Sequence, residues 1–167
     1  MIFSEILKEK KQISDNIKNL YSLPKKNKSI WLIKLKNTDL LKPLIDGLKY
    51  LPSNFIIESN SINEEEYNNI KFSNNTNKLR IGFDFLVCDE EIEELNDYLS
   101  KWIVPIIINT SHLSSILKEF NPIKNEWNSY LFKENNQYDI YYAIIRYLEN
   151  YKFPFDNKNL VKNVCEM

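Results

Sequence analysis

The sequence contains very little glycine, cysteine and histidine. Among its 167 residues there are two glycines, two cysteines and one histidine. With only Gly47 and Gly82, the chain has no glycine-rich phosphate-binding loop of either common type. Two cysteines and one histidine make neither a disulfide framework nor a metal site built from histidine and cysteine ligands. We therefore expect no metal ion and no cofactor.

A long hydrophobic run and an excess of basic charge are also absent. The longest apolar run, Trp102 to Ile108, has seven residues and includes Pro105, whereas a membrane span needs about 20. Lysine and arginine number 22 against 23 acidic residues, so the basic excess typical of a nucleic-acid-binding protein is missing. The first residues include Glu5 and no signal-peptide hydrophobic stretch. We expect a cytoplasmic protein that binds neither membrane nor nucleic acid.

The hydrophobic residues, 43% of the chain, suffice for one core, and no linker divides residues 1–167. Helical periodicity predicts helices at 3–20, 39–50, 141–151 and 157–164, the last capped by Asp156. Short apolar runs predict strands at 29–35, 54–58, 104–108 and 129–132, with one or two more within 78–88. Strands that alternate with helices predict a single α/β domain, a Rossmann-like, mostly parallel sheet with helices on both faces.

Three local signals predict further helix starts. The capping box from Ser61 to Glu64 predicts a helix that continues to about residue 72. Acidic residues at 89–91 suit the N-terminus of a helix that ends near Trp102. Thr110 and Ser111 are placed to cap a helix that runs to about residue 120.

Two features allow a catalytic or a structural interpretation. The single histidine, His112, could act as a base, but no serine or cysteine partner stands in a recognisable motif. The acidic run at 89–94 could contain a catalytic carboxylate pair, or it could be the solvated start of a helix. We favour the structural interpretation of both.

Several segments together resemble the C-terminal lobe of glycogen and starch synthases, which are two-lobed GT-B glycosyltransferases. Residues 83–87 (FDFLV) resemble the family's strand ADFLLMPS, and 104–107 (VPII) resemble GTVPIV. Residues 110–113 (TSHL) stand where the family has TGGL, and 128–132 (NSYLF) resemble GTGFLF. Residues 142–151 resemble EALRRALELY, and 30–41 resemble IGIVSRL followed by KGLDLL. The same order of segments covers nearly the whole chain.

The resemblance implies a lobe that binds the nucleoside diphosphate of ADP-glucose or UDP-glucose. Lys34 and Lys36 stand for the family's Arg and Lys on the first loop, which stabilise the leaving diphosphate. Thr110, Ser111 and His112 stand for the TGG backbone. These five residues are the predicted donor-binding residues, and the sequence identifies no catalytic residue.

The sequence also departs from the family pattern. The donor loop EPCGLTQ should lie between Cys88 and Leu99, but this segment is shorter, lacks glycine and is acidic, which repels a diphosphate. Because 167 residues correspond to one lobe, we expect no glucose transfer without an acceptor lobe, which a separate chain could provide. Two hypotheses remain: a glycosyltransferase-like donor lobe that is inactive alone, and a non-catalytic protein-interaction module on a degenerate glycosyltransferase fold.

All three tryptophans stand where the family tends to have glycine. They are Trp31, Trp102 and Trp127. Trp102 follows an amphipathic helix, at the place where a left-handed residue is usual. One hypothesis is that UGA codons for glycine were translated as tryptophan. The alternative is ordinary drift with three tryptophans that pack in the protein.

Overall fold

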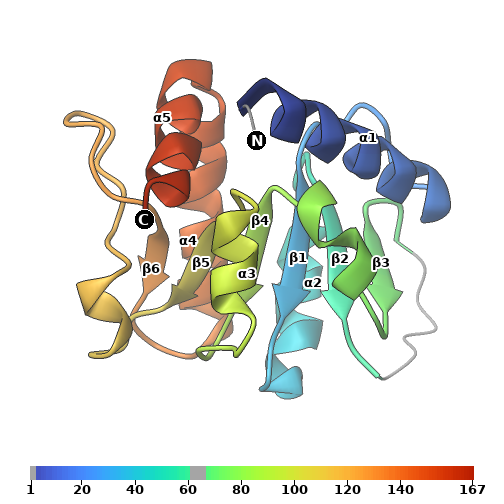
Figure 1. The fold of residues 1–167 in the computed structure, drawn as a ribbon. Helices are drawn as coiled ribbons and strands as arrows, with labels where there is room; N and C mark the ends of the chain where they lie inside the picture. Colours follow the sequence, from blue (N-terminus) through green and yellow to red (C-terminus); the bar gives the residue numbers. More distant parts are fainter. Residues whose placement is uncertain (1–2, 61–66) are drawn as a thin grey trace.

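The computed structural model describes residues 3–60 and 67–167 and contains one six-stranded sheet (Figure 1). The strand order is β3-β2-β1-β4-β5-β6, and all neighbouring strands are parallel. The strands are β1 (Ile30–Lys34), β2 (Asn54–Glu58), β3 (Ile70–Ser73), β4 (Phe85–Cys88), β5 (Val104–Ile108) and β6 (Tyr130–Phe132). The predicted Rossmann-like α/β class is therefore confirmed, with a wholly parallel sheet.

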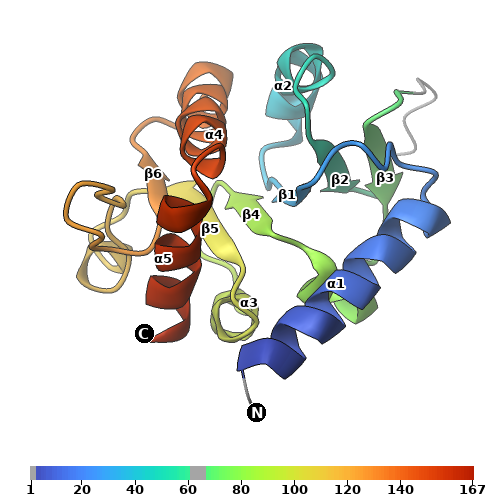
Figure 2. The same ribbon diagram turned by 90° about the horizontal axis from the view of Figure 1, so that it is seen from above.

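Helices cover both faces of this sheet (Figures 1 and 2). Helices α1 (Phe3–Leu20), α3 (Leu95–Ser100) and α5 (Pro154–Cys165) lie on one face. Helices α2 (Leu41–Leu48) and α4 (Gln137–Tyr151) lie on the other. Short 3₁₀ turns occupy Thr38–Leu40, Asn77–Gly82 and Leu113–Ser115. Within residues 3–60 and 67–167, none of the helices has both the length and the apolar character that a membrane span requires.

The core is centred on an aromatic cluster between the sheet and α4. Trp31 on β1 is fully buried, with its ring centroid 4.5 Å from that of Phe85 on β4. The Phe85 ring lies 4.3 Å from that of Tyr147 on α4, and the Tyr147 hydroxyl donates to Asn157 on α5. Because both faces of the central strands are covered, these strands are apolar on both sides.

The helices predicted up to residues 72 and 120 do not form there. In the first segment the backbone pairs as a strand, and in the second serine side chains compete for the backbone hydrogen bonds. Ile70 and Phe72 belong to β3, which pairs in parallel with β2; the predicted capping box at 61–64 lies outside the described residues. Only the turn Leu113–Ser115 forms in the segment after Ser111. There the hydroxyls of Ser114 and Ser115 donate to backbone carbonyls three residues earlier, which competes with helix formation.

The start of α3 and the segment before β4 also differ from prediction. The helix begins at Leu95 instead of at the acidic residues 89–91, because these acidic residues contact other loops. Residues Asn77–Gly82 form a 3₁₀ turn, so only Phe85–Cys88 is a strand in this region. Gly82 allows α1 to approach closely, since a Cβ there would lie 2.6 Å from Ile17 Cδ1.

Two of the three tryptophans adopt a left-handed backbone. The φ angles are 59° at Trp102 and 73° at Trp127, whereas neither glycine has a positive φ. Bulky residues rarely adopt this region and glycine does so freely, which supports the glycine-codon hypothesis at these two positions. Trp31 is different, because it lies in β1 and fills the core. A UGG codon at any of the three positions would exclude the hypothesis there.

We expect the Trp127→Gly variant to be more stable than Trp127→Ala by about 1 kcal/mol, because alanine is strained at a positive φ. Both variants lose the contact with Lys118, whose Nζ lies 4.1 Å from the Trp127 ring centroid, so this loss cancels. At Trp31, which lies in an extended strand, the Trp31→Ala variant should be more stable than Trp31→Gly by about 0.5–1 kcal/mol. Urea denaturation of the four variants measures both differences, and the same order at both positions would contradict the left-handed assignment.

Candidate functional site

The strand order places a topological switch point between β1 and β4. The chain proceeds from β1 toward β3 on one side and from β4 toward β6 on the other, so connections leave these two strands in opposite directions. Ligands of open α/β sheets bind outside the carboxyl ends of the strands at such a point. The carboxyl ends lie at the lower margin in Figure 1, and we call this side of the sheet the carboxyl edge.

The Asp89 carboxylate occupies the backbone donors at this switch point. Its Oδ1 accepts from Lys36 N at 2.7 Å, and its Oδ2 accepts from Asn37 N at 3.0 Å. Oδ2 also accepts from Asn135 Nδ2 at 3.2 Å, and Asp89 is buried. Successive backbone N–H groups are a typical binding site for anions. Here an acid of the chain itself binds them and ties together the loops after β1, β4 and β6.

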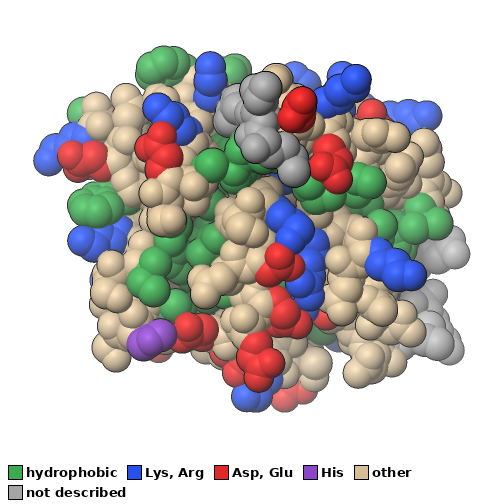
Figure 3. All heavy atoms as spheres, viewed as in Figure 1, with side chains coloured by type: hydrophobic (Ala, Val, Ile, Leu, Met, Phe, Trp, Pro, Cys, Tyr) green, Lys and Arg blue, Asp and Glu red, His purple; other side chains and the backbone are tan. Residues whose placement is uncertain are grey.

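The two acidic residues after Asp89 pair with two of the predicted donor-binding residues. Glu90 Oε2 lies 2.9 Å from Lys36 Nζ, and Glu91 Oε2 lies 2.8 Å from His112 Nδ1. The hydrogen bond with Glu90 raises the pKa of Lys36. Both pairs are largely exposed, so they contribute little to stability. Figure 3 shows the single imidazole, in purple, beside acidic side chains at the lower margin.

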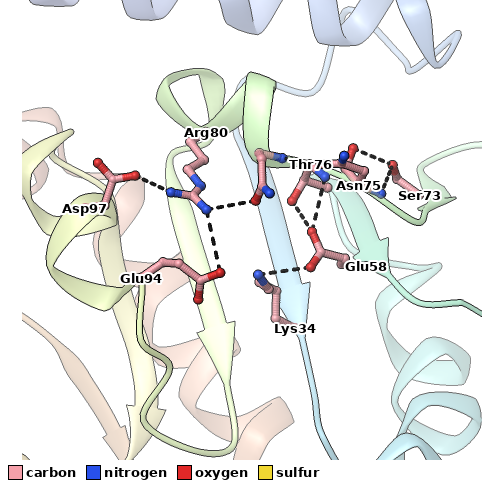
Figure 4. Close-up of polar contacts among 9 residues, drawn as sticks. Lys34, Glu58, Ser73, Asn75, Thr76, Arg80, Glu94 and Asp97 are labelled. Carbon is pink, nitrogen blue, oxygen red and sulfur yellow. Dashed lines mark hydrogen bonds and ion pairs between the residues drawn. The ribbon is translucent and has the colours of Figure 1, made fainter.

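Lys34 contacts a different set of partners, which Figure 4 shows. Its Nζ lies 3.0 Å from Glu58 Oε1, and the other oxygen of Glu58 accepts from the backbone N–H and the hydroxyl of Thr76. Burial alone would lower the pKa of Lys34 and raise that of Glu58. The hydrogen bonds and opposite charges outweigh burial, so the pKa of Lys34 is raised and that of Glu58 is lowered.

Arg80 forms the other half of the network in Figure 4. It pairs with Asp97 and Glu94 from the region of α3, and its guanidinium lies 5.1 Å from the centroid of the Tyr98 ring. The Nζ of Lys34 lies 5.8 Å from the centroid of the same ring. Lys34 therefore lies within a network that joins β1, β2 and α3, and its charge is largely neutralised there.

Thr110 and Ser111 lie in the loop after β5, where they stabilise a turn. Thr110 Oγ1 accepts from Leu113 N at 3.3 Å, and the Ser111 carbonyl accepts from Ser114 Oγ at 2.8 Å. The His112–Glu91 pair connects this loop to the loop after β4. All five predicted donor-binding residues thus lie in or directly after β1 and β5, and each has an internal partner.

Sequence analysis missed the residues that organise this edge, Asp89 and Asn135. The one signal for Asp89 was its place directly after the buried run Phe85–Cys88, where a parallel strand reaches the ligand-binding edge. Asn135 carried no signal, because its contact spans 46 positions of sequence. Among the residues that the structure describes, no group of three His, Cys, Asp or Glu side chains could hold a metal ion.

Comparison with known proteins finds similarity only in solved structures. No protein-family model and no curated protein matches the chain. The catalytic domain of starch synthase IV from Arabidopsis thaliana, bound to ADP and acarbose, superposes with a TM-score of 0.70 at 13% identity. The match covers 95% of this chain and 39% of that one.

Other matching structures are also glycosyltransferases. The glycosyltransferase of kitacinnamycin has a TM-score of 0.58 at 8% identity, covering 84% of this chain and 40% of that chain. The spinosyn forosaminyltransferase SpnP has a TM-score of 0.55 at 11% identity, covering 85% and 40%. The chain therefore has the fold of one lobe of the GT-B glycosyltransferases and spans about two fifths of the length of these structures.

We expect the Glu58→Gln variant to lose about 1 kcal/mol or less of stability at pH 7, because the pair with Lys34 is only partly shielded from solvent. The folded pKa of Glu58 lies below its usual 4.5. The contribution of Glu58 to stability is therefore fully present above pH 4.5 and is lost as the pH falls through the folded pKa. Stability from urea denaturation should fall less steeply below pH 4.5 in the variant than in the wild type.

The matched control is Glu93→Gln, which removes the same charge from an exposed position. It should leave the acid limb of the pH profile unchanged. Parallel profiles for the wild type and Glu58→Gln would show that Glu58 titrates normally and would contradict the prediction.

Proposed function

We propose that this chain is the donor-side lobe of a GT-B glycosyltransferase-like protein. Its carboxyl edge would bind the nucleoside diphosphate of a nucleotide-sugar, ADP-glucose or UDP-glucose. The observation that carries the proposal is the match over 95% of the chain with a starch synthase domain whose structure is described as bound to ADP. The switch point between β1 and β4, where ligands of such sheets bind, supports the same edge.

In this proposal, the loops after β1 and β5 bind the diphosphate. Lys36 is an exposed cation in the loop after β1, and it acts as a point charge on the phosphate oxygens. The backbone N–H groups of Lys36 and Asn37 are the donors that a phosphate would use, once Asp89 releases them. Thr110, Ser111 and His112 contribute from the loop after β5.

The acidic residues at 89–91 oppose this binding. A diphosphate must replace Asp89 at the backbone donors and must separate Lys36 from Glu90. The binding free energy of the diphosphate is therefore only the difference between its new contacts and the internal contacts that it replaces. We therefore expect weak binding, and sugar transfer only together with an acceptor lobe.

The internal contacts also favour a second candidate function, a non-catalytic interaction module. Asp89, Glu90 and Glu91 together neutralise or occupy the groups that would attract an anion. A glycosyltransferase fold with this edge closed would retain its scaffold and serve a protein partner.

Titration calorimetry with ADP, UDP, ADP-glucose and UDP-glucose distinguishes the two functions. We expect millimolar binding to the wild-type chain. The Asp89→Asn variant should bind about three- to tenfold more tightly, because a negative charge beside the phosphates is removed.

The control variant is Glu126→Gln, which removes one negative charge from an exposed loop. It should leave the affinity unchanged. Absence of heat for both the wild type and a folded Asp89→Asn variant would contradict the donor-lobe proposal and favour the interaction module.

A further inference from the structure

Two adjoining hollows lie between α1 and α5, away from the carboxyl edge. Their cavity volumes are about 420 and 370 Å³, and both are lined by Leu7, Lys28, Asn157 and Val161. Lys28 and Asp84, which line the second hollow, lie within two residues of the starts of β1 and β4. The hollows therefore lie at the amino ends of the strands. We call the two together the amino-edge pocket.

The pocket is rich in lysines that form no direct ion pair with a described residue. Six lysines line it: Lys10, Lys11, Lys18, Lys25, Lys28 and Lys158. Within residues 3–60 and 67–167, none of them lies within 4.0 Å of a carboxylate oxygen. Among the predicted donor-binding residues, by contrast, Lys34, Lys36 and His112 are each paired with a glutamate. In a protein of net charge −1, this local excess is a distinctive feature.

Two acidic residues also line the pocket, and they offset this charge only in part. Asp15 lies on the exposed side of α1. Asp84 is recessed, and its Oδ2 accepts from Ile30 N at 2.8 Å. Burial raises the pKa of Asp84 and lowers that of Lys10, whereas the charges of Lys10 and Lys18 oppose the rise at Asp84. Nearby, the Nζ of buried Lys10 donates to the carbonyls of Ile81 and Phe83. Asp84 and Lys10 are therefore held by the fold, whereas Lys25 and Lys28 are exposed.

One side of the pocket is apolar. Leu7 from α1 faces Tyr151, Pro154 and Val161 from the end of α4 and from α5. Lys28 lines both hollows, so it joins the apolar side to the lysine-rich side. A volume of this size suits a small molecule with a ring or short chain, and the lysines suit a multiply charged anion.

We propose that the amino-edge pocket binds a small organic phosphate. Lys25 and Lys28 bind the phosphate group, with Lys11 and Lys18 close by, and the apolar side contacts the organic body. This site is separate from the carboxyl edge and does not depend on the donor-lobe proposal. It would give the lobe a second ligand, at the edge of the sheet opposite to the switch point.

Titration of the intact chain with phenyl phosphate and with inorganic phosphate tests the proposal by amide chemical shifts. Phenyl phosphate should bind in a saturable way and about three- to tenfold more tightly than inorganic phosphate, because its ring is removed from water. The double variant Lys25→Gln/Lys28→Gln should weaken phenyl phosphate binding about tenfold.

The matched control is Lys42→Gln/Lys124→Gln, which removes two exposed lysines elsewhere. It should keep the affinity within about twofold of the wild type. The saturable shift changes should fall on residues that line the amino-edge pocket and not on the loops after β1 and β5, which separates this pocket from the carboxyl edge. The proposal is overturned by the absence of saturable phenyl phosphate binding to the wild type. It is also overturned if the double variant binds as tightly as the wild type, or if the control pair weakens binding equally.

Discussion

The Asp89 carboxylate is the contact on which the carboxyl edge depends. It accepts from Lys36 N, Asn37 N and Asn135 Nδ2, so one side chain fixes three loops at the switch point, where the connections between strands reverse direction. In a nucleotide-binding lobe, backbone donors at such a place are available to phosphate. Their occupation by an internal acid preserves the loop geometry while it reduces the attraction for an external anion. The same contact thus holds the three loops together and competes with an external anion.

Charge is distributed differently at the two edges of the sheet. At the carboxyl edge and beside it, Lys34, Lys36 and His112 each face a glutamate. At the amino edge, lysines from α1, from the loop before β1 and from α5 line one pocket without ion pairs among the described residues. The net charge of −1 does not reveal this separation of charge. The separation arises only in the folded chain, where the topology brings distant lysines together.

Elements with a strong local signal could be predicted from the sequence. Strand β2 was predicted with its observed bounds, because its apolar run is buried against both layers. The failures involve contacts between distant residues. The acidic residues at 89–91 suit a helix N-terminus locally, but Asp89 instead binds N–H groups more than 50 positions away. The family resemblance selected the donor-binding residues, and the glutamate partners that the structure gives to Lys34, Lys36 and His112 could not be foreseen from spacing.

Helix α4 extends between the two regions, which raises the question of whether they are coupled. Its N-terminus follows Asn135, which binds Asp89, and its last residue, Tyr151, lines the amino-edge pocket. Proximity along one helix does not amount to coupling, since coupling requires an element with two arrangements that each ligand stabilises differently. The Tyr147 ring is fully buried against Phe85, and its hydroxyl binds Asn157, which holds α4 against β4 and α5. A helix fixed in this way favours independent binding at the two edges.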